Sequence, residues 1–362
     1  MIAKSRRMLW CGVMRRHRSA IVVVALLLAG CTTISYYVQS IGGQLRLISH
    51  REPIQTLLND PTKDAKLKQQ LRQAQAIRDF ASQVLKLPDN DSYRNYVQLQ
   101  HPYVVWSLFA TPEFSLQPEQ WCFPIAGCVF YRGYFSEQAA QKFAQALRAQ
   151  GRDVYVGGVT AYSTLGWFDD PLLSSMLSQG EVDTAATIFH ELAHQQVYVS
   201  GDTAFNEAFA TAVANAGIRR WLKRHGGRAA IHAYAVAWRR KQDFLDLVEE
   251  ARARLAALYA SHKDAAHMRA AKRAIIAHMR ADYRDLKRRW GGYNGYDYWF
   301  EHPINNAKLA AVAIYREFVP DFVRLLKACG GDFARFYQKV EEIGELAPEQ
   351  RHARLNSVRT CS

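Results

Sequence analysis

Two histidines separated by one helical turn constrain this chain more than any other feature of its sequence. They belong to the pentapeptide His-Glu-Leu-Ala-His at 190–194, which lies in a window with apolar residues at helical spacing. Residues four apart share one face of a helix, so His190 and His194 can meet one metal ion while Glu191 lies beside them. The pattern predicts a helix over 184–199 that carries a zinc site.

A catalytic zinc ion needs a third protein ligand and an open fourth position. The sequence offers Glu207, which follows His194 after twelve intervening residues and lies in a second predicted helix over 205–225. The short loop at 200–202 would let the second helix fold against the first. A chance match to the pentapeptide is on the order of a few per cent in a chain with 12 histidines. A buried structural His/Glu network and a degenerate peptidase that only binds metal are the alternatives.

The first thirty residues have the composition of an export signal. Positions 1–20 hold six Lys or Arg and no acidic residue, and an apolar run of ten residues follows at 21–30. Such a run is too short to span a bilayer comfortably as a helix. The sequence Leu-Ala-Gly-Cys at 28–31 resembles the lipobox of bacterial lipoproteins, in which the cysteine is lipidated and begins the mature chain. An ordinary signal peptide or a short membrane anchor is the alternative.

The expected export signal accounts for part of the positive net charge of the chain. The chain has 47 Lys+Arg against 33 Asp+Glu, a balance of +14, and removing residues 1–30 leaves 41 − 33 = +8. No nucleic-acid-binding motif accompanies the charge, so we expect no nucleic-acid partner. We expect a protein of the bacterial cell envelope, anchored to a membrane through lipidated Cys31 and facing the periplasm, at the outer membrane in preference to the inner.

Four cysteines follow Cys31, and an oxidising compartment favours their pairing. Cys122 and Cys128 flank a short loop that contains proline and glycine, so we expect them to pair with each other. Cys329 and Cys361 are then the remaining pair. A zinc knuckle at Cys122 and Cys128 is the alternative, but only two thiols are close in sequence and no histidine flanks them.

Apolar periodicity elsewhere predicts a mainly helical chain. Residues 32–118, 135–150 and those from about 305 onward are predicted to be mainly helical. Residues 153–162 have strong β-propensity and two glycines, and are predicted to form a strand at a sheet edge. Two apolar stripes within 241–290 predict a long helical hairpin.

The surroundings of the pentapeptide resemble known peptidases. His190-Glu191-x-x-His194, followed by Asn-Glu-Ala-Phe-Ala at 206–210, is similar to the gluzincin metallopeptidases, the clan of thermolysin and aminopeptidase N. The sequence around Glu207 is closer to the aminopeptidases. The lipobox and the segments 121–124, 131–135, 161–168 and 305–309 extend a resemblance to a bacterial family of predicted aminopeptidase lipoproteins over nearly all of 31–340. The twelve-residue spacer is shorter than in aminopeptidase N, so the scaffold between the helices is not carried over.

The resemblance implies one Zn²⁺ ion held by His190, His194 and Glu207. Glu191 would act as general base, taking a proton from the activated water and relaying it to the leaving amine. We expect an α+β, predominantly helical fold: a zincin-like catalytic domain with a small mixed β-sheet, built from 31–240 and 291–362. Residues 1–30 would be the lipoprotein signal peptide and 241–290 the inserted helical hairpin.

Other site residues are less constrained by the sequence. Such enzymes usually add a Tyr or His that stabilises the tetrahedral oxyanion. The candidates are Tyr162, Tyr293, Tyr296 and Tyr298, and the glycines around Tyr293 and Tyr296 favour that loop, although a surface turn with packed aromatics is the alternative. An edge strand at 154–162 could pair with an extended peptide, and an interior strand is the alternative for this segment. Carboxylates that could hold the α-amine of an aminopeptidase substrate are Glu113, Asp169 and Asp170, for which helix capping or a role in a turn is the alternative.

We therefore expect a zinc-dependent metallopeptidase that acts on peptide substrates, with aminopeptidase activity as the leading assignment. A zinc endopeptidase is one alternative. A non-catalytic envelope lipoprotein that retains the fold as a scaffold or binding module is another, but the general base Glu191 would have no use in a scaffold. No protein partner can be inferred.

Overall fold

The computed structural model describes residues 35–361, apart from 124–126, 262 and 315–317. The expected signal peptide and Cys31 lie outside the described residues. Within the described ranges, no helix combines the length and apolar character needed to cross a membrane.

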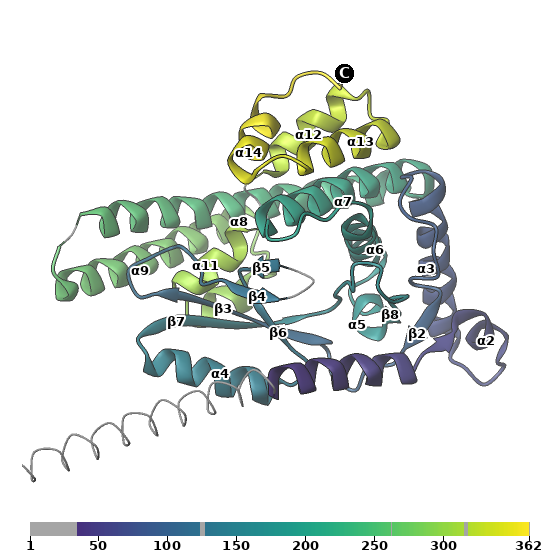
Figure 1. The fold of residues 1–362 in the computed structure, drawn as a ribbon, viewed down its shortest axis with the longest axis horizontal. Helices are drawn as coiled ribbons and strands as arrows, with labels where there is room; N and C mark the ends of the chain where they lie inside the picture. Colours follow the sequence, from purple (N-terminus) through teal and green to yellow (C-terminus); the bar gives the residue numbers. More distant parts are fainter. Residues whose placement is uncertain (1–34, 124–126, 262, 315–317, 362) are drawn as a thin grey trace, which may run out of the picture.

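Helices dominate the chain, and short strands lie between them (Figure 1). A helix at 35–49 comes first. The strands are β1 (Glu52–Pro53), β2 (Asn95–Val97), β3 (Val105–Pro112), β4 (Trp121–Phe123), β5 (Gly127–Val129), β6 (Arg132–Tyr134), β7 (Arg152–Val159) and β8 (Leu172–Leu173). The further helices are α2 (Ile54–Asn59), α3 (Ala65–Gln83), α4 (Glu137–Ala149), α5 (Ser174–Leu177), α6 (Glu181–Gln196), α7 (Thr203–His225), α8 (Arg228–Ala260), α9 (Ala265–Arg289), α10 (Asp297–Glu301), α11 (Asn306–Ala313), α12 (Val319–Ala328), α13 (Phe333–Gly344) and α14 (Pro348–Ser357). The predicted α+β class with a helical majority is confirmed.

The strands form small separate sheets. The order β6-β3-β7 is antiparallel throughout, β1-β2-β8 is mixed, and β4 pairs with β5. The predicted strand is β7, and it lies at an edge of its sheet, as expected. The prediction of helix across 32–118 is wrong for 105–112, which forms the central strand β3. Most of this strand is buried, so its sequence is a nearly continuous apolar run that periodicity cannot separate from a buried helix.

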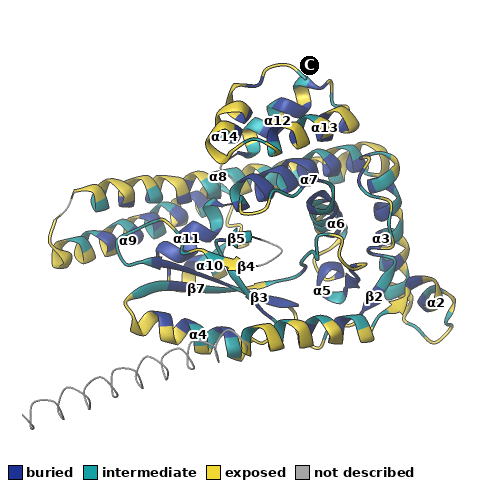
Figure 2. Cartoon of the chain, in the orientation of Figure 1, coloured by how far each residue is buried: buried dark blue, intermediate teal, exposed yellow. Residues whose placement is uncertain are grey.

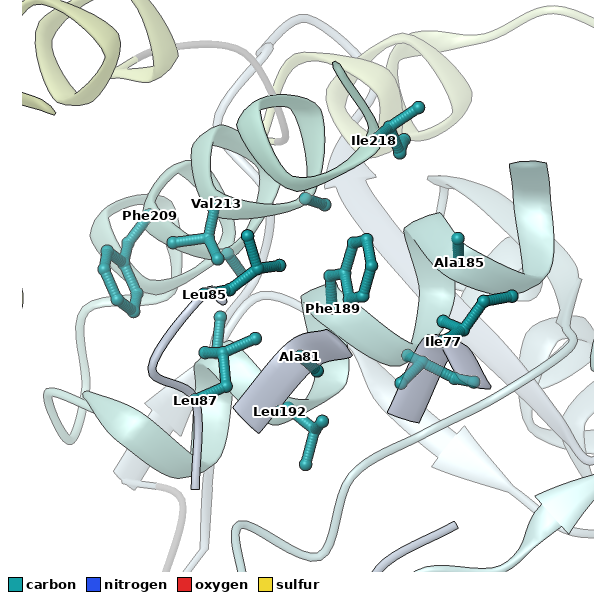
Figure 3. Close-up of a cluster of buried hydrophobic side chains, with 14 of the residues drawn as sticks. Ile77, Ala81, Leu85, Leu87, Ala185, Phe189, Leu192, Phe209, Val213 and Ile218 are labelled. Carbon is teal, nitrogen blue, oxygen red and sulfur yellow. The ribbon is translucent and has the colours of Figure 1, made fainter. Parts of the chain in front are cut away.

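Helices α6 and α7 form the centre of the main core. Figure 3 shows Phe189 of α6 among side chains of α3 and α7, and Figure 2 shows that α7 is buried over most of its length. A Cβ atom at Gly217 of α7 would lie 2.6 Å from a ring carbon of Phe189 and 2.7 Å from a methyl carbon of Leu85. Only glycine permits this approach, so Gly217 fixes the separation between the two helices.

The predicted hairpin is formed by α8 and α9, which pack along each other and project to the left in Figure 1. Helix α8 begins at Arg228, earlier than the predicted boundary at 241. Side chains from both helices share a hydrophobic cluster with Phe300, Ile304 and Leu309 from the segment that follows. The hairpin is therefore packed on the rest of the chain through α10 and α11.

Two disulfides join the cysteines in the pairs that the sequence analysis expects, Cys122 with Cys128 and Cys329 with Cys361. The first bridges β4 and β5 directly across the pair. A Cβ atom at Gly127 of β5 would lie 2.6 Å from the backbone nitrogen of Gly201. The closed β4–β5 hairpin therefore contacts the loop that connects α6 to α7.

Candidate functional site

One side of helix α6, the helix that carries His190 and His194, is strongly apolar. Gly180 begins the helix with a φ of 92°, and acidic residues in the first turn favour its N-terminus. Ile188, Phe189 and Leu192 are fully buried against the core. Burial of this face fixes the rotation of the helix and leaves the pentapeptide's polar side chains at the border of the core.

Helix α7 delivers the third residue through its first turn. The Asp202 carboxylate accepts a hydrogen bond from the Phe205 backbone N–H and caps the helix. The buried Asn206 amide donates to the Val199 carbonyl at 2.7 Å and accepts from the Val199 N–H at 2.8 Å. These bonds hold the first turn of α7 against Val199, in the loop between α6 and α7, so they set the direction of the neighbouring Glu207.

The side chains of His190, His194 and Glu207 converge. The Nε2 atoms of the two histidines lie 3.1 Å apart, and Glu207 Oε2 lies 3.2 Å from His190 Nε2 and 3.7 Å from His194 Nε2. Ligands at about 2.0–2.1 Å from a tetrahedral zinc ion lie about 3.3 Å from one another. The three donor atoms thus fit one zinc ion, with nitrogen and oxygen donors of the kind zinc accepts.

The orientation of the His194 ring supports this arrangement. Its Nε2 faces the other two donors, whereas its buried Nδ1 has no hydrogen-bond partner among the described residues. Nε2 is therefore the ring nitrogen available for a metal.

The charges of Glu207, His194 and Glu191 shift one another's pKa values. Burial would raise the pKa of Glu207, but the charges and hydrogen bonds of His194 and His190 outweigh burial and lower this pKa to about 2. Burial would lower the pKa of His194, but Glu207 raises it. Burial raises the pKa of Glu191, while the two histidines lower it. Glu207 is therefore an anion that the imidazoles of His194 and His190 stabilise, and a carboxylate must be an anion to bind a metal ion.

A cleft of about 340 Å³ opens beside these residues. Glu191 lines it together with His190, His194 and Glu207. Its opposite walls come from β3, the β4–β5 hairpin, the start of β6 and the segment after β7, and the helix at 35–49 contributes Tyr36 and Ser40. The predicted edge strand thus leads into the cleft through Val159 and Ala161.

The predicted tyrosines separate into two groups. Tyr162 lines the cleft, and burial, followed by the charge of Asp170, raises its pKa. Tyr293 and Tyr296 do not line the cleft, and their packing corresponds to the alternative of a turn with packed aromatics. Tyr296 stacks on Phe244 of the hairpin at 4.4 Å between ring centroids, and Tyr293 lies 4.1 Å from the Arg240 guanidinium. Both rings are therefore engaged by the hairpin, Tyr296 by stacking and Tyr293 by a cation–π contact, although Tyr293 stays 39 % exposed.

Tyr298 also lies outside the cleft lining, with 74 % of its surface exposed.

Sequence reasoning missed three other tyrosines that line the cleft, Tyr36, Tyr131 and Tyr198. Burial raises the hydroxyl pKa of Tyr131 and of Tyr198, and Glu207 is the next contribution in each case, so these two lie close to its carboxylate. Tyr198 follows the end of α6 at Gln196, so helical spacing from His194 does not account for its position in the cleft. Tyr131 precedes β6, and no local pattern connects it with the pentapeptide.

None of the candidate amine-binding carboxylates lines the cleft. Glu113 pairs with Arg269 of the hairpin through two contacts of 2.6 and 2.8 Å. Asp169 is exposed at the surface. Asp170 is buried and accepts hydrogen bonds from the Thr164 N–H at 3.0 Å and the Thr164 hydroxyl at 2.8 Å. Asp170 therefore shapes the loop that carries Ser163 and Leu165 into the cleft wall.

A family model described as "Putative aminopeptidase" matches residues 35–355. No curated protein and no solved structure matches the chain.

Proposed function

Because the chain belongs to this aminopeptidase family over 35–355, we propose that it is a zinc-dependent metallopeptidase of the gluzincin type. The observation that carries the proposal is the convergence of His190, His194 and Glu207, whose ligand atoms all lie within 4.8 Å of one another. Glu191 lines the same cleft and directly follows His190 in the chain, and this supports its role as the general base. A structural His/Glu network would account for the ion pairs but not for their opening onto a cleft.

When bound, zinc would activate a water molecule and polarise the scissile carbonyl. Glu191 would accept the proton of the attacking water and deliver it to the departing nitrogen. Tyr131 and Tyr198 line the same cleft and, like ordinary tyrosines, keep their hydroxyl protons at neutral pH. Either hydroxyl could then donate a hydrogen bond to the developing oxyanion.

Metal removal tests this proposal. We expect the purified protein to contain one zinc ion per chain and to lose peptide hydrolysis in 1,10-phenanthroline, with recovery when zinc is restored. Zinc binds the folded chain in preference to the unfolded one, so the metal-free protein should also unfold at a lower temperature. The measurements are elemental analysis, hydrolysis rate and thermal unfolding.

Two results would contradict the proposal. One is hydrolysis that persists unchanged in protein shown to be free of metal. The other is a metal-free protein whose unfolding temperature does not rise on titration with zinc, since a preorganised three-ligand site must bind the ion.

We also propose that the chain is lipid-anchored in the bacterial cell envelope through Cys31. The helix at 35–49 begins four residues after this cysteine, and its outer side carries three apolar side chains that are more than half exposed, Val38, Ile41 and Leu45. An apolar helix face of this kind suits a membrane surface. Mass spectrometry of the full chain produced in a bacterium should find a mature N-terminus at Cys31 carrying acyl groups. An unmodified cysteine, or processing elsewhere, would refute the anchor.

A further inference from the structure

We infer that the cleft takes an uncharged, apolar stretch of peptide and does not bind a free α-amine, so the enzyme cleaves within peptides. This inference rests on the proposed peptidase function and names the substrate class of the same site. It departs from the activity that the family description suggests.

The first observation is the absence of formal charge from the cleft walls. Apart from the three converging residues and Glu191, every described residue that lines the cleft is aliphatic, aromatic, glycine or a neutral hydroxyl residue. Val105, Val159 and Leu165 give it aliphatic surface, and Phe123 and Phe135 give it aromatic surface. The serine and tyrosine hydroxyls can hydrogen-bond the substrate backbone, which carries no charge.

The second observation concerns the nearest carboxylates. Glu207 is engaged by both histidines, and Glu191 is needed in proton transfer. Asp170 lies behind the wall, where Thr164 and Gln195 donate hydrogen bonds to it. No other carboxylate lines the cleft among the described residues. An α-ammonium would therefore enter an apolar space without a partner of opposite charge.

A free α-ammonium group is strongly disfavoured inside this cleft. An ionised ammonium transferred from water to an apolar site loses its hydration, and the loss is compensated only by a paired or hydrogen-bonded anion. The same reasoning excludes Lys, Arg, Asp and Glu side chains from the positions that occupy the cleft. An internal peptide bond places both charged termini outside the cleft and avoids this cost.

The loop that contributes Leu165 to the cleft also carries exposed apolar side chains. Trp167 and Phe168 follow Leu165 on this loop and are 67 % and 50 % exposed. Exposed aromatic side chains on a loop that forms part of the cleft wall can contact further apolar residues of a longer substrate. The cleft volume of about 340 Å³ is at the lower limit for ligand sites, so it accommodates only the residues next to the scissile bond.

Peptide series test the inference with the zinc-loaded full chain. Peptides of one sequence are compared with a free or acetylated N-terminus, and with Leu, Phe, Lys or Asp at the cleavage position. Acetylation should change kcat/KM by less than about fivefold, because an amine outside the cleft is a solvated charge. Replacing Leu by Lys or Asp should lower kcat/KM by roughly 10²-fold or more. Mass spectrometry of the products should locate internal cleavage.

Removal of single N-terminal residues, from free peptides alone, would overturn the inference while leaving the peptidase proposal intact. If no peptide is hydrolysed, the zinc-loaded Glu191→Gln variant still provides a binding assay by fluorescence anisotropy. Tighter binding of acetylated Leu or Phe peptides than of Lys peptides supports the inference. A requirement for the free amine in that assay refutes it.

A gained charge offers a converse test. Ser107 on β3 lines the cleft and is half-buried, so Ser107→Glu would add a carboxylate there. We expect the ratio of kcat/KM for the Lys peptide to that for the Leu peptide to rise by about tenfold. The matched control is Ser261→Glu, at an exposed position at the end of α8, which should leave the ratio unchanged. An unchanged ratio in Ser107→Glu would contradict the inferred selectivity.

Discussion

Glu191→Gln is expected to lower kcat for peptide hydrolysis by roughly 10²–10⁴-fold, the usual contribution of a general base. The amide has nearly the same shape as the carboxyl but cannot accept the proton of the attacking water. Because this role belongs to the transition state, KM should change little. The variant should still bind zinc, since Glu191 is not among the three converging ligands. Steady-state kinetics and elemental analysis give the two readouts.

Glu181→Gln provides the matched control on the same helix. Glu181 lies in the first turn of α6, where its Oε1 accepts a hydrogen bond from the Trp221 indole, and the glutamine oxygen can accept the same bond. Its kcat should equal that of the wild type. Equal activity in Glu191→Gln would show that Glu191 is not the base.

In the same assay, Phe variants of Tyr131 and Tyr198 should identify the oxyanion donor by a loss of roughly 10²–10³-fold in kcat.

Loss of one metal ligand is expected to abolish activity by a different route. In Glu207→Gln the side chain keeps its volume but loses its charge. Loss of a residue that only hydrogen-bonds a metal ligand lowers metal affinity by about 10–100-fold, so loss of the ligand itself should lower zinc affinity by more than roughly 10²-fold. His190→Ala should lose zinc as well. It should also unfold more easily, because a chain that has lost zinc loses the stabilisation that the bound ion gives the folded state. The measurements are zinc affinity and the free energy of unfolding.

His267→Ala is the control for this series, because its side chain is exposed on the hairpin, where it contacts Lys263. It should bind zinc and unfold like the wild type. If Glu207→Gln retained wild-type zinc affinity, Glu207 would not be a ligand and the assignment of the third position would be wrong.

The ligand set could be predicted from the sequence because it depends on local geometry. The relation between His190 and His194 is fixed within a single helix, and the short loop before α7 brings Glu207 back to them. Helix ends depend on neighbouring residues as well: the Asp202 side chain caps α7, which begins at Thr203 and not at the expected position 205. Helical spacing and caps act over a few residues, which is the range over which a single sequence is informative.

The cleft walls could not be predicted in this way. Val105 and Ser107 belong to a strand buried within the fold, whose apolar run carries no period, and Tyr131 reaches the cleft only through the tertiary arrangement. The position of the loop at 291–296 could not be predicted from its glycines either. Gly291 and Gly292 adopt positive φ values, as expected for a turn, but the packing of Tyr296 on Phe244 depends on a tertiary contact with the hairpin.

The contribution of Tyr36 and Ser40 to the cleft wall limits where the enzyme can act. Five peptide units separate Cys31 from Tyr36, so even a fully extended chain spans at most about 18 Å between them. With Cys31 lipidated as proposed, the cleft stays close to the bilayer surface and cannot sample the volume of the compartment. Substrates held in the same membrane would then meet it by two-dimensional diffusion at a raised effective concentration, whereas freely diffusing peptides would gain no such advantage.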